Sequence, residues 1–322
     1  MTKTKMRASL FILLGSLFLL WCFGTVNGAE QFPNKPIRLI SPQGPGSGND
    51  LVCRIVKDPL SQALGVPVVV ENKAGGGSAI GSDYVVKSKP DGYTILSASA
   101  AGIVIIPIIS PTYKFDDLVP IAKVSWAAMV LSVRADSPFK TFEDLLDFTK
   151  KNPGKLSYAS AGHGSITYFA IEILKWKAGA DLTFVPTTAG TTNMAAILGG
   201  HVDVVMDSFA TQRGLIESGQ IRPLAAVPKT RFLPNVPSFA EKGFPEAPGS
   251  FIGHFVPKGT PQPVIQKLMQ ALEKTTSTPL VISQAEKIGY EIDYVPADKF
   301  LQEISAQYKT VETVAKKVGL AK

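Results

Sequence analysis

Two glycine-rich turns near the start of the chain have the composition of an anion-binding site. The first occupies residues 41–50 (SPQGPGSGND) after the apolar run 37–40, and the second occupies residues 72–78 (NKAGGGS) after the β-branched run 66–70. Glycine lets the backbone turn tightly and approach a ligand closely. The helix that we expect after each turn begins with unpaired N–H groups and a partial positive charge. Each turn therefore predicts a place to hold a carboxylate or a phosphate.

A third turn of the same kind lies near the middle of the chain. Residues 160–165 (SAGHGS) follow the apolar run 156–159 and precede a helix that we predict over residues 166–177. Open α/β sheets bind ligands beside the carboxyl ends of their strands. We therefore expect the three turns to lie together at that edge of the fold.

Two acidic residues are candidates for contact with a ligand, and each has a structural alternative. Asp50 either contacts the ligand or a water molecule, or it is the N-cap of the helix that follows it. Asp207 ends a predicted strand, where its carboxylate either accepts a hydrogen bond from a ligand hydroxyl or amine, or serves as a turn acid. Ser78 and Ser165 begin helices, so each can cap its helix and also donate to a ligand.

The chain lacks the residue patterns of catalytic and metal sites. It contains no G-x-S-x-G nucleophile elbow and no G-x-x-x-x-G-K-[ST] phosphate loop. Its three histidines are scattered and do not have the spacing of metal ligands. We therefore predict a protein that is not an enzyme and that has no cofactor and no metal site.

Residues 1–28 have the pattern of a secretory signal peptide. A basic start precedes the apolar stretch 10–23, which is too short to span a bilayer comfortably. Small residues follow, so we expect cleavage near Gly28 and a periplasmic mature protein, with an uncleaved anchor as the alternative. We discount lipidation at Cys22 because the bulky Trp21 precedes it. Cys53 is then the one cysteine left, so no disulfide can form within the mature chain.

Composition indicates a globular protein with a sizeable core. Of the 322 residues, 45% are hydrophobic and 18% are charged. The formal net charge is +7, and removal of the three basic residues of the signal leaves 30 basic and 26 acidic residues, a net +4. The basic residues are scattered, which argues against nucleic acid as a partner. The mild positive charge favours an anionic ligand.

Strand-like and helix-like segments alternate, which predicts an α/β fold with mainly parallel sheets. The predicted strands are residues 37–40, 66–70, 93–97, 127–133, 156–159, 182–185, 202–206, 222–227 and 251–256. The predicted helices are residues 50–64, 79–88, 141–151, 166–177, 192–198, 212–218, 263–275, 281–287 and 297–318. Residues 231–249 are rich in proline and glycine and are expected to form a long loop.

Taken in order, these segments resemble the periplasmic solute-binding proteins of tripartite tricarboxylate transporters, the Bug or TctC family. Residues 42–50 match the family pattern P-x-x-P-G-G-x-x-D, and residues 68–77 are similar to V-V-V-E-N-[RK]-x-G-x-G. Further matches lie at residues 32–40, 89–94, 152–155, 197–203 and 257–261. Each motif alone is weak, but their joint order and spacing are specific and extend over nearly the whole mature chain.

The resemblance implies the fold of a type II periplasmic binding protein, a Venus flytrap. Two lobes, each a mainly parallel sheet flanked by helices, would close on a ligand. Lobe 1 would hold residues 29–128 and 256–322, and lobe 2 would hold residues 129–255. The strands at 127–133 and 251–256 would cross between the lobes and act as the hinge.

The resemblance also implies a small organic carboxylate as ligand. In the family, the loop carried here by residues 43–49 grips a carboxylate through backbone N–H groups and bridging water, and residues 162–165 hold its far end. This chain has Gln43 where an aromatic residue is usual, Ser47 where a glycine is usual, and Thr187 in place of a frequent tyrosine. The predicted ligand-binding residues are Gln43, Gly44, Gly46, Ser47, Gly48, Asn49, Asp50, Ser78, Ser97, Ser99, Gly162, His163, Gly164, Ser165, Thr187 and Asp207.

We therefore predict an exported, monomeric receptor that captures a carboxylate and delivers it to the membrane permease subunits of a tripartite tricarboxylate transporter. Two alternatives stay open. The protein would be a sensor subunit if it presented its ligand to a membrane kinase. It would be an exported α/β hydrolase or isomerase if it turned over a small acid.

Overall fold

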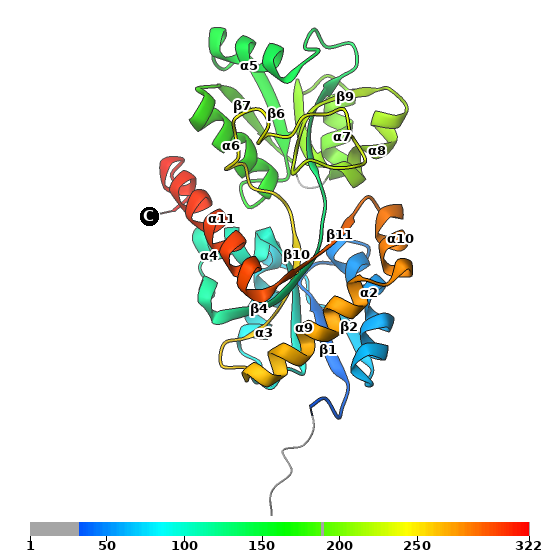
Figure 1. The fold of residues 1–322 in the computed structure, drawn as a ribbon. Helices are drawn as coiled ribbons and strands as arrows, with labels where there is room; N and C mark the ends of the chain where they lie inside the picture. Colours follow the sequence, from blue (N-terminus) through cyan, green and yellow to red (C-terminus); the bar gives the residue numbers. More distant parts are fainter. Residues whose placement is uncertain (1–31, 188–189, 322) are drawn as a thin grey trace, which may run out of the picture. The chain divides into compact units, whose positions relative to one another are not determined.

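The computed structural model describes residues 32–187 and 190–321, and it arranges their strands in two separate sheets (Figure 1). The predicted signal segment 1–28, with its cleavage near Gly28 and the question of lipidation at Cys22, lies outside the described residues. Among the described residues, no helix combines the length and the apolar character needed to cross a bilayer.

The first sheet has the strand order β11-β4-β10-β3-β1-β2. Its strands are β1 (Ile37–Ser41), β2 (Val68–Asn72), β3 (Thr94–Ser99), β4 (Leu118–Trp126), β10 (Ile252–Pro257) and β11 (Glu291–Pro296). β1 runs parallel to β2 and β3, so the ends of these three strands lie at one edge of the sheet. β10 runs antiparallel to both of its neighbours, β3 and β4.

The second sheet has the strand order β7-β6-β8-β5-β9. Its strands are β5 (Met129–Arg134), β6 (Leu156–Ser160), β7 (Leu182–Pro186), β8 (Val204–Ser208) and β9 (Ile221–Val227). β6 runs parallel to β7 and β8, whereas β5 runs antiparallel to β8 and β9. The two-sheet α/β fold is thus confirmed, but both sheets are mixed. The antiparallel strands β5 and β10 directly follow the segments where the chain passes from one sheet to the other.

Helices pack against both sheets (Figure 1). Those in the part of the chain that forms the first sheet are α2 (Gly48–Leu64), α3 (Ala79–Val86), α4 (Ile106–Ile109), α9 (Gln262–Thr276), α10 (Pro279–Lys287) and α11 (Ala297–Lys317). Those in the part that forms the second are α5 (Phe142–Lys151), α6 (Ile166–Ala178), α7 (Gly190–Leu198) and α8 (Phe209–Glu217). Residues 231–249 form the predicted long loop of turns between β9 and β10.

Helix α2 shows how the sequence pattern produces this packing. Val52, Cys53, Val56 and Leu60 recur at helical spacing and are buried, so one face of the helix lies against the sheet and against α9. Gly65 ends the helix with φ of 74°, a left-handed conformation that glycine adopts without a steric penalty. Cys53 is fully buried, as the sequence predicts, and burial raises the pKa of its thiol to about 12.

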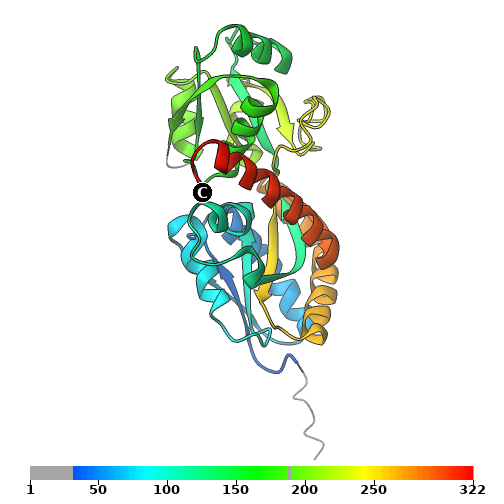
Figure 2. The same cartoon turned by 90° about the vertical axis from the view of Figure 1, so that its left-hand side faces the viewer.

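The C-terminal helix α11 is anchored in the core of the first sheet. Phe300 is fully buried and packs edge-on against Phe251 and at a tilt against Phe255, with ring centroids 5.0 and 5.6 Å away. A Cβ atom at Gly253 would lie only 2.4 Å from the Phe300 ring, so the absence of a side chain there makes room for the helix. Figure 2 shows α11, in red, running along the molecule, where it contacts both β4 and α6.

Candidate functional site

The three glycine-bearing turns lie at the strand ends that the sequence predicts, and they line one cavity of about 460 Å³. The first sheet contributes residues that follow β1, β2 and β3, together with Ser250, Ile252 and Tyr290. The second sheet contributes residues that follow β6, together with Gly190 and Asp207. The lining residues are Pro42, Gln43, Gly44, Asn49, Ala74, Gly75, Gly77, Ser78, Ser99, Ala100, Ala101, Ala161, Gly164, Ser165, Ile166, Thr167, Gly190, Asp207, Ser250, Ile252 and Tyr290.

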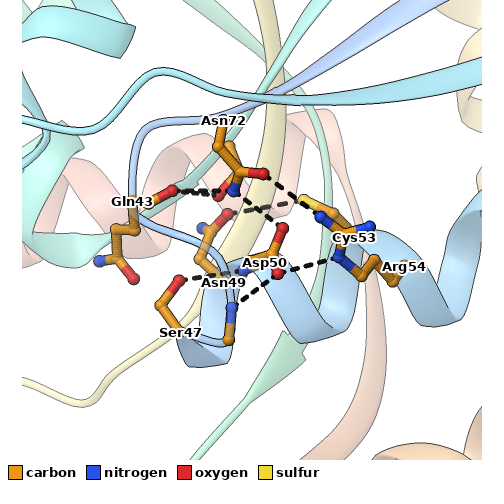
Figure 3. Close-up of polar contacts among 9 residues, drawn as sticks. Gln43, Ser47, Asn49, Asp50, Cys53, Arg54 and Asn72 are labelled. Atoms are coloured by element: carbon orange, nitrogen blue, oxygen red, sulfur yellow. Dashed lines mark hydrogen bonds and ion pairs between the residues drawn. The ribbon is translucent and has the colours of Figure 1, made fainter.

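Asp50 holds the first turn in shape through hydrogen bonds of its side chain (Figure 3). Its Oδ2 accepts hydrogen bonds from the Gly46 amide and from Arg54 Nε, both at 2.9 Å, and its Oδ1 accepts one from Asn72 Nδ2 at 2.8 Å. Asn72 Nδ2 also donates to the carbonyl oxygen of Gln43 at 2.9 Å. Burial alone would raise the pKa of the Asp50 carboxyl, but these hydrogen bonds outweigh burial and lower it.

The helix after this turn begins two residues earlier than predicted, which rules out the N-cap alternative for Asp50. Ser47 is the N-cap of α2, and its side chain accepts a hydrogen bond from the Asp50 amide at 3.3 Å. Asp50 is therefore not the N-cap, and it does not line the cavity. The side chain instead joins the first turn to the end of β2, so it fixes the positions of both turns.

The second turn has an unusual backbone. Gly75, Gly76 and Gly77 all have positive φ, and Ser78 has φ of 90°, the one positive φ at a non-glycine among the residues described. Ser78 is buried, lines the cavity and precedes α3. A left-handed serine beside a cavity is the kind of strained conformation that concentrates at functional sites.

The third turn leads into α6, where Ser165 is the N-cap. Its hydroxyl oxygen accepts a hydrogen bond from the Tyr168 amide at 3.1 Å, and its hydroxyl donates to the Gly162 carbonyl at 2.8 Å. The cap satisfies one of the free amides of the helix start, and Ile166 and Thr167 line the cavity next to it. The positive end of the α6 dipole therefore points toward the cavity.

Among the described residues that line the cavity, Asp207 is the one with a charged side chain. Its Oδ2 accepts a hydrogen bond from Asn193 Nδ2 at 2.6 Å, and its Oδ1 accepts one from the Ser208 amide at 2.7 Å. Burial raises the pKa of the Asp207 carboxyl, against the hydrogen bonds from Asn193, Ser208 and Thr211 that lower it. No lysine, arginine or histidine is among the described lining residues, so an anion in the cavity would be held by amides, hydroxyls and helix dipoles.

Asn49, which lines the cavity, has a buried hydrogen-bond donor without a partner among the described residues. The side chain is 2% exposed, its Oδ1 faces Cys53 Sγ at 3.6 Å, and its Nδ2 has no partner among the described residues. Buried amide groups are normally paired, because an unpaired donor costs free energy. Asn49 Nδ2 is therefore a candidate contact for a ligand oxygen, and this contact stays a prediction.

The structure brings half of the predicted binding residues to the cavity. Those that line it are Gln43, Gly44, Asn49, Ser78, Ser99, Gly164, Ser165 and Asp207. Those that do not line it are Gly46, Ser47, Gly48, Asp50, Ser97, Gly162, His163 and Thr187. Whether the first group contacts a ligand stays a prediction.

Most residues of the second group have partners inside the protein. The Gly46 amide donates to Asp50, the Gly162 amide donates to the Ser160 carbonyl at 2.8 Å, and the Thr187 hydroxyl donates to the same carbonyl at 2.9 Å. His163 packs edge-on against Tyr168 and Phe184 with ring centroids 4.8 and 4.9 Å away. Ser97 lies fully buried within β3.

Tyr290 is the main lining residue that sequence reasoning missed. It lies between α10 and β11, and its hydroxyl occupies the space beside Gly48, where a Cβ atom would lie 1.8 Å from Tyr290 Oη. Burial, followed by the negative charge of Asp207, raises the pKa of Tyr290 to about 12. A lone tyrosine before an unrecognised edge strand carries no motif, so the sequence offered no signal for it.

Comparisons with known proteins agree with this architecture. The family model of the tripartite tricarboxylate transporter family receptor, TctC, matches residues 52–320. The "UPF0065 protein in tcbD-tcbE intergenic region" of Pseudomonas sp. (strain P51) is 36% identical over 269 residues, which are 81% of this chain and 79% of that protein.

Two solved structures have the same fold. The periplasmic binding protein BugD is 28% identical with a TM-score of 0.71, over 90% of this chain and 99% of BugD. The R. palustris protein Rpa4515 with adipate is 25% identical with a TM-score of 0.74, over 90% of this chain and 99% of that protein. The matched turns, the two-sheet fold and these relatives agree, and the chain belongs to the TctC (Bug) family of periplasmic solute-binding proteins.

Proposed function

We propose that this protein captures a small organic carboxylate in the 460 Å³ cavity and delivers it to the membrane permease subunits of a tripartite tricarboxylate transporter. The observation that carries the proposal is the convergence of three glycine-bearing turns and the start of α6 on one cavity. A structural neighbour holds adipate, a dicarboxylate, which supports the ligand class.

The proposed binding of a carboxylate depends on hydrogen-bond donors of the cavity that replace water around the anion. Backbone amides at turns and helix starts replace the hydration shell of a carboxylate without placing a cationic side chain beside it. Hydrogen bonds to charged groups contribute about 1.5–3 kcal/mol each, so a few of them give useful affinity. Because the amides come from both sheets, a bound ligand favours the arrangement in which both sets reach it.

We propose that this coupling closes two lobes, residues 29–128 with 256–322 and residues 129–255, about the crossing strands. The closed form would present the docking surface to the permease, and the receptor would act as a monomer that returns its ligand unchanged. Cleavage near Gly28 would accompany export, and N-terminal sequencing of the mature protein tests the cleavage site directly.

The experiment that tests the function has two parts. Mass spectrometry of material released from the purified protein should identify a carboxylate, and the same compound should raise the melting temperature in a screen of mono-, di- and tricarboxylates. Recovery of the added compound without chemical change distinguishes a receptor from an enzyme. If no carboxylate co-purifies and none stabilises the protein at millimolar concentration, the proposal is wrong.

A further inference from the structure

Glu291 is bonded to both of the segments through which the chain passes between the two sheets. The chain leaves the first sheet after β4, which ends at Trp126, and it returns through residues 228–251, between β9 and β10. Glu291 begins β11, where it pairs with Trp126, and its carbonyl oxygen accepts a hydrogen bond from Ser125 Oγ at 3.0 Å. The main chain of Glu291 is thus fixed to the outward passage.

The side chain of Glu291 is fixed to the return passage. Its Oε1 accepts a hydrogen bond from the Thr230 hydroxyl at 2.7 Å, and its Oε2 pairs with Arg231 Nε at 3.2 Å. Arg231 also pairs with Glu286, near the end of α10, at 2.6 Å. Thr230 is 3% exposed and the Glu291 side chain is 14% exposed, so water competes little for the hydrogen bond between them.

The two residues before Glu291 connect it to α8 and to the cavity. A Cβ atom at Gly289 would lie 3.0 Å from the Cα atom of Ala210 in α8, so the absence of a side chain there lets the two segments approach closely. Tyr290 lines the cavity, and its hydroxyl lies beside Gly48 at the start of α2. Tyr290 is therefore held between two neighbours that both contact residues of the second sheet's part of the chain.

Glu291 itself does not line the cavity. Its contacts lie where the chain passes between the sheets, which is where a closing movement turns. Hydrogen bonds and ion pairs of a carboxylate are stronger than bonds between neutral groups, so an arrangement that separates Glu291 from Thr230 and Arg231 is disfavoured. The contacts of Glu291 thus restrict how the two passages lie relative to each other.

We propose that Glu291 braces the hinge and is a positioning residue for the cavity, because it holds the two passages together and thereby fixes Tyr290 in the cavity wall. This inference rests on the proposed closure of two lobes about the crossing strands. Without the brace, the protein without ligand adopts a wider range of lobe arrangements, of which a smaller fraction binds. The apparent dissociation constant rises by the factor by which that fraction falls.

Three variants change the brace in different ways. Thr230→Val removes the hydroxyl that donates to Glu291 and keeps the shape of the side chain. Thr230→Ser keeps the hydroxyl and should restore the brace. Glu291→Gln removes the charge that Arg231 meets. Glu217→Gln removes a charge from the exposed ion pair of Arg213 and Glu217 in α8, away from both passages, and serves as the control.

The first measurement needs no ligand. Double electron–electron resonance would measure the distance between spin labels at Lys89→Cys, in the turn before β3, and Lys150→Cys, near the end of α5. Both lysines are exposed, whereas Cys53 is buried and does not react with the label. We expect Thr230→Val and Glu291→Gln to broaden the distribution of distances. Thr230→Ser and Glu217→Gln should keep the distribution of the wild type.

The second measurement is calorimetry with adipate, malate and citrate. For each compound that binds the wild type, Thr230→Val should raise the dissociation constant about 5-fold or more, and Thr230→Ser should stay within about 2-fold of the wild type. Urea unfolding of each variant gives its stability. Binding is measured where every variant is folded, so a loss of stability alone leaves the dissociation constant unchanged.

The outcomes separate this inference from the proposed function. Unchanged distance distributions in Thr230→Val and Glu291→Gln would overturn the brace, whichever carboxylates bind. Broader distributions with wild-type affinities would contradict the positioning role of Glu291. If the distributions broaden but no carboxylate in the wider screen binds the wild type, the brace is supported and the proposed function is wrong.

Discussion

Asp50 affects the cavity without lining it. Its carboxylate is 1% exposed and accepts hydrogen bonds from the first turn, from Arg54 and from Asn72 at the end of β2. These contacts fix two turns at once. The sequence shows an acidic residue in a glycine-rich loop, but it does not show which way the side chain points.

We expect Asp50→Asn to destabilise the protein by about 1–3 kcal/mol. The amide NH₂ of asparagine would face N–H groups that now donate hydrogen bonds to the carboxylate. Affinity for the carboxylate ligand should also fall as the turns lose their alignment. Urea unfolding and calorimetry measure the two effects. Asp58→Asn lies on the same helix with its side chain 75% exposed and should change stability by less than about 0.5 kcal/mol.

The lowered pKa of Asp50 also predicts how the stability lost in Asp50→Asn depends on pH. Hydrogen bonding holds this pKa below its ordinary value, so its contribution to stability is present at neutral pH and is lost as pH falls through the folded-state pKa. Asp50→Asn should therefore destabilise less at acidic pH than at pH 7. A loss of stability that is the same at both pH values would contradict this account.

From the burial of His254 we predict a second loss of stability at acidic pH. It lies on β10, is fully buried, and neither of its ring nitrogens has a partner among the described residues. Burial lowers its pKa from 6.5 to about 3. The unfolded chain therefore takes up this proton first, and stability falls by up to about 1.4 kcal/mol per pH unit between pH 6.5 and 3.

Replacing His254 by leucine should remove that part of the pH dependence. Urea unfolding at pH 7 and pH 5 would show a smaller difference for His254→Leu than for the wild type. His201→Gln changes an exposed histidine and serves as the control, with the wild-type difference expected. A His254→Leu variant with an unchanged pH dependence would mean that the histidine does not titrate on unfolding.

At the scale of elements, the most informative contact joins the start of α2 to the segment before β11. A Cβ atom at Gly48 would lie 1.8 Å from Tyr290 Oη. Gly48→Ala should therefore displace Tyr290, lower stability by about 1–3 kcal/mol and weaken ligand binding. In a Tyr290→Ala background the cost of Gly48→Ala should nearly vanish, and this double-mutant cycle measures the contact.

The matched control for that substitution is Gly214→Ala. Gly214 lies exposed in α8 with open space around its Cα, so alanine should raise stability by up to about 1 kcal/mol through helix propensity. If Gly48→Ala behaves like Gly214→Ala, the Tyr290 hydroxyl does not occupy that space in solution.

The N-caps of α5 and α6 provide a second test variant and its matched control. Thr141 and Ser165 each accept a hydrogen bond from the amide three residues later, both at 3.1 Å, but only Ser165 lines the cavity. Each alanine variant should cost about 1 kcal/mol of stability. Calorimetry should show weaker ligand binding for Ser165→Ala alone. Equal affinities in the two variants would remove the start of α6 from the binding site.

Element types followed well from local pattern, with most boundaries correct within two or three residues. The capping box at Thr141 and Asp144 was predicted and is present. β4 and β11 were missed for physical reasons. β4 contains Pro120 and the ion-paired Lys123, which interrupt an apolar pattern, and β11 is a half-exposed edge strand. Both depend on pairing with distant strands, which local sequence does not show.

At the scale of the whole molecule, the sequence predicted the three turns at one cavity because α/β sheets bind ligands at the carboxyl ends of their strands. Parallel pairing brings the first two turns together in the first sheet, whereas the third turn comes from the second sheet. It could not place Tyr290 or show that Gly46 and Thr187 have partners inside the protein. Tyr290 reaches the first turn from a distant segment, Gly46 is held by Asp50 within its own turn, and Thr187 is held by Ser160 at the end of the neighbouring strand. Local sequence shows none of these contacts. The family resemblance predicted the fold correctly, whereas the contacts of the lining residues became known only from the three-dimensional structure.

Ligand binding should change the whole molecule and not only the cavity. A ligand held by residues of both sheets favours a closed arrangement, so small-angle X-ray scattering should show a smaller radius of gyration when the cavity is saturated. At 100 times the dissociation constant the ligand adds about 2.7 kcal/mol of stability. Chloride at equal ionic strength is the control. An unchanged radius with full occupancy would contradict closure.

The distance along the chain between Gly48 and Tyr290 has a consequence for biogenesis. A polypeptide threaded through a secretion pore from its amino end delivers the first turn early and the tyrosine only near the end. The pocket wall next to α2 is incomplete until that late segment arrives. Under the proposed function, a partly translocated chain would lack this wall, and ligand capture would begin only after the segment that carries Tyr290 has crossed the membrane.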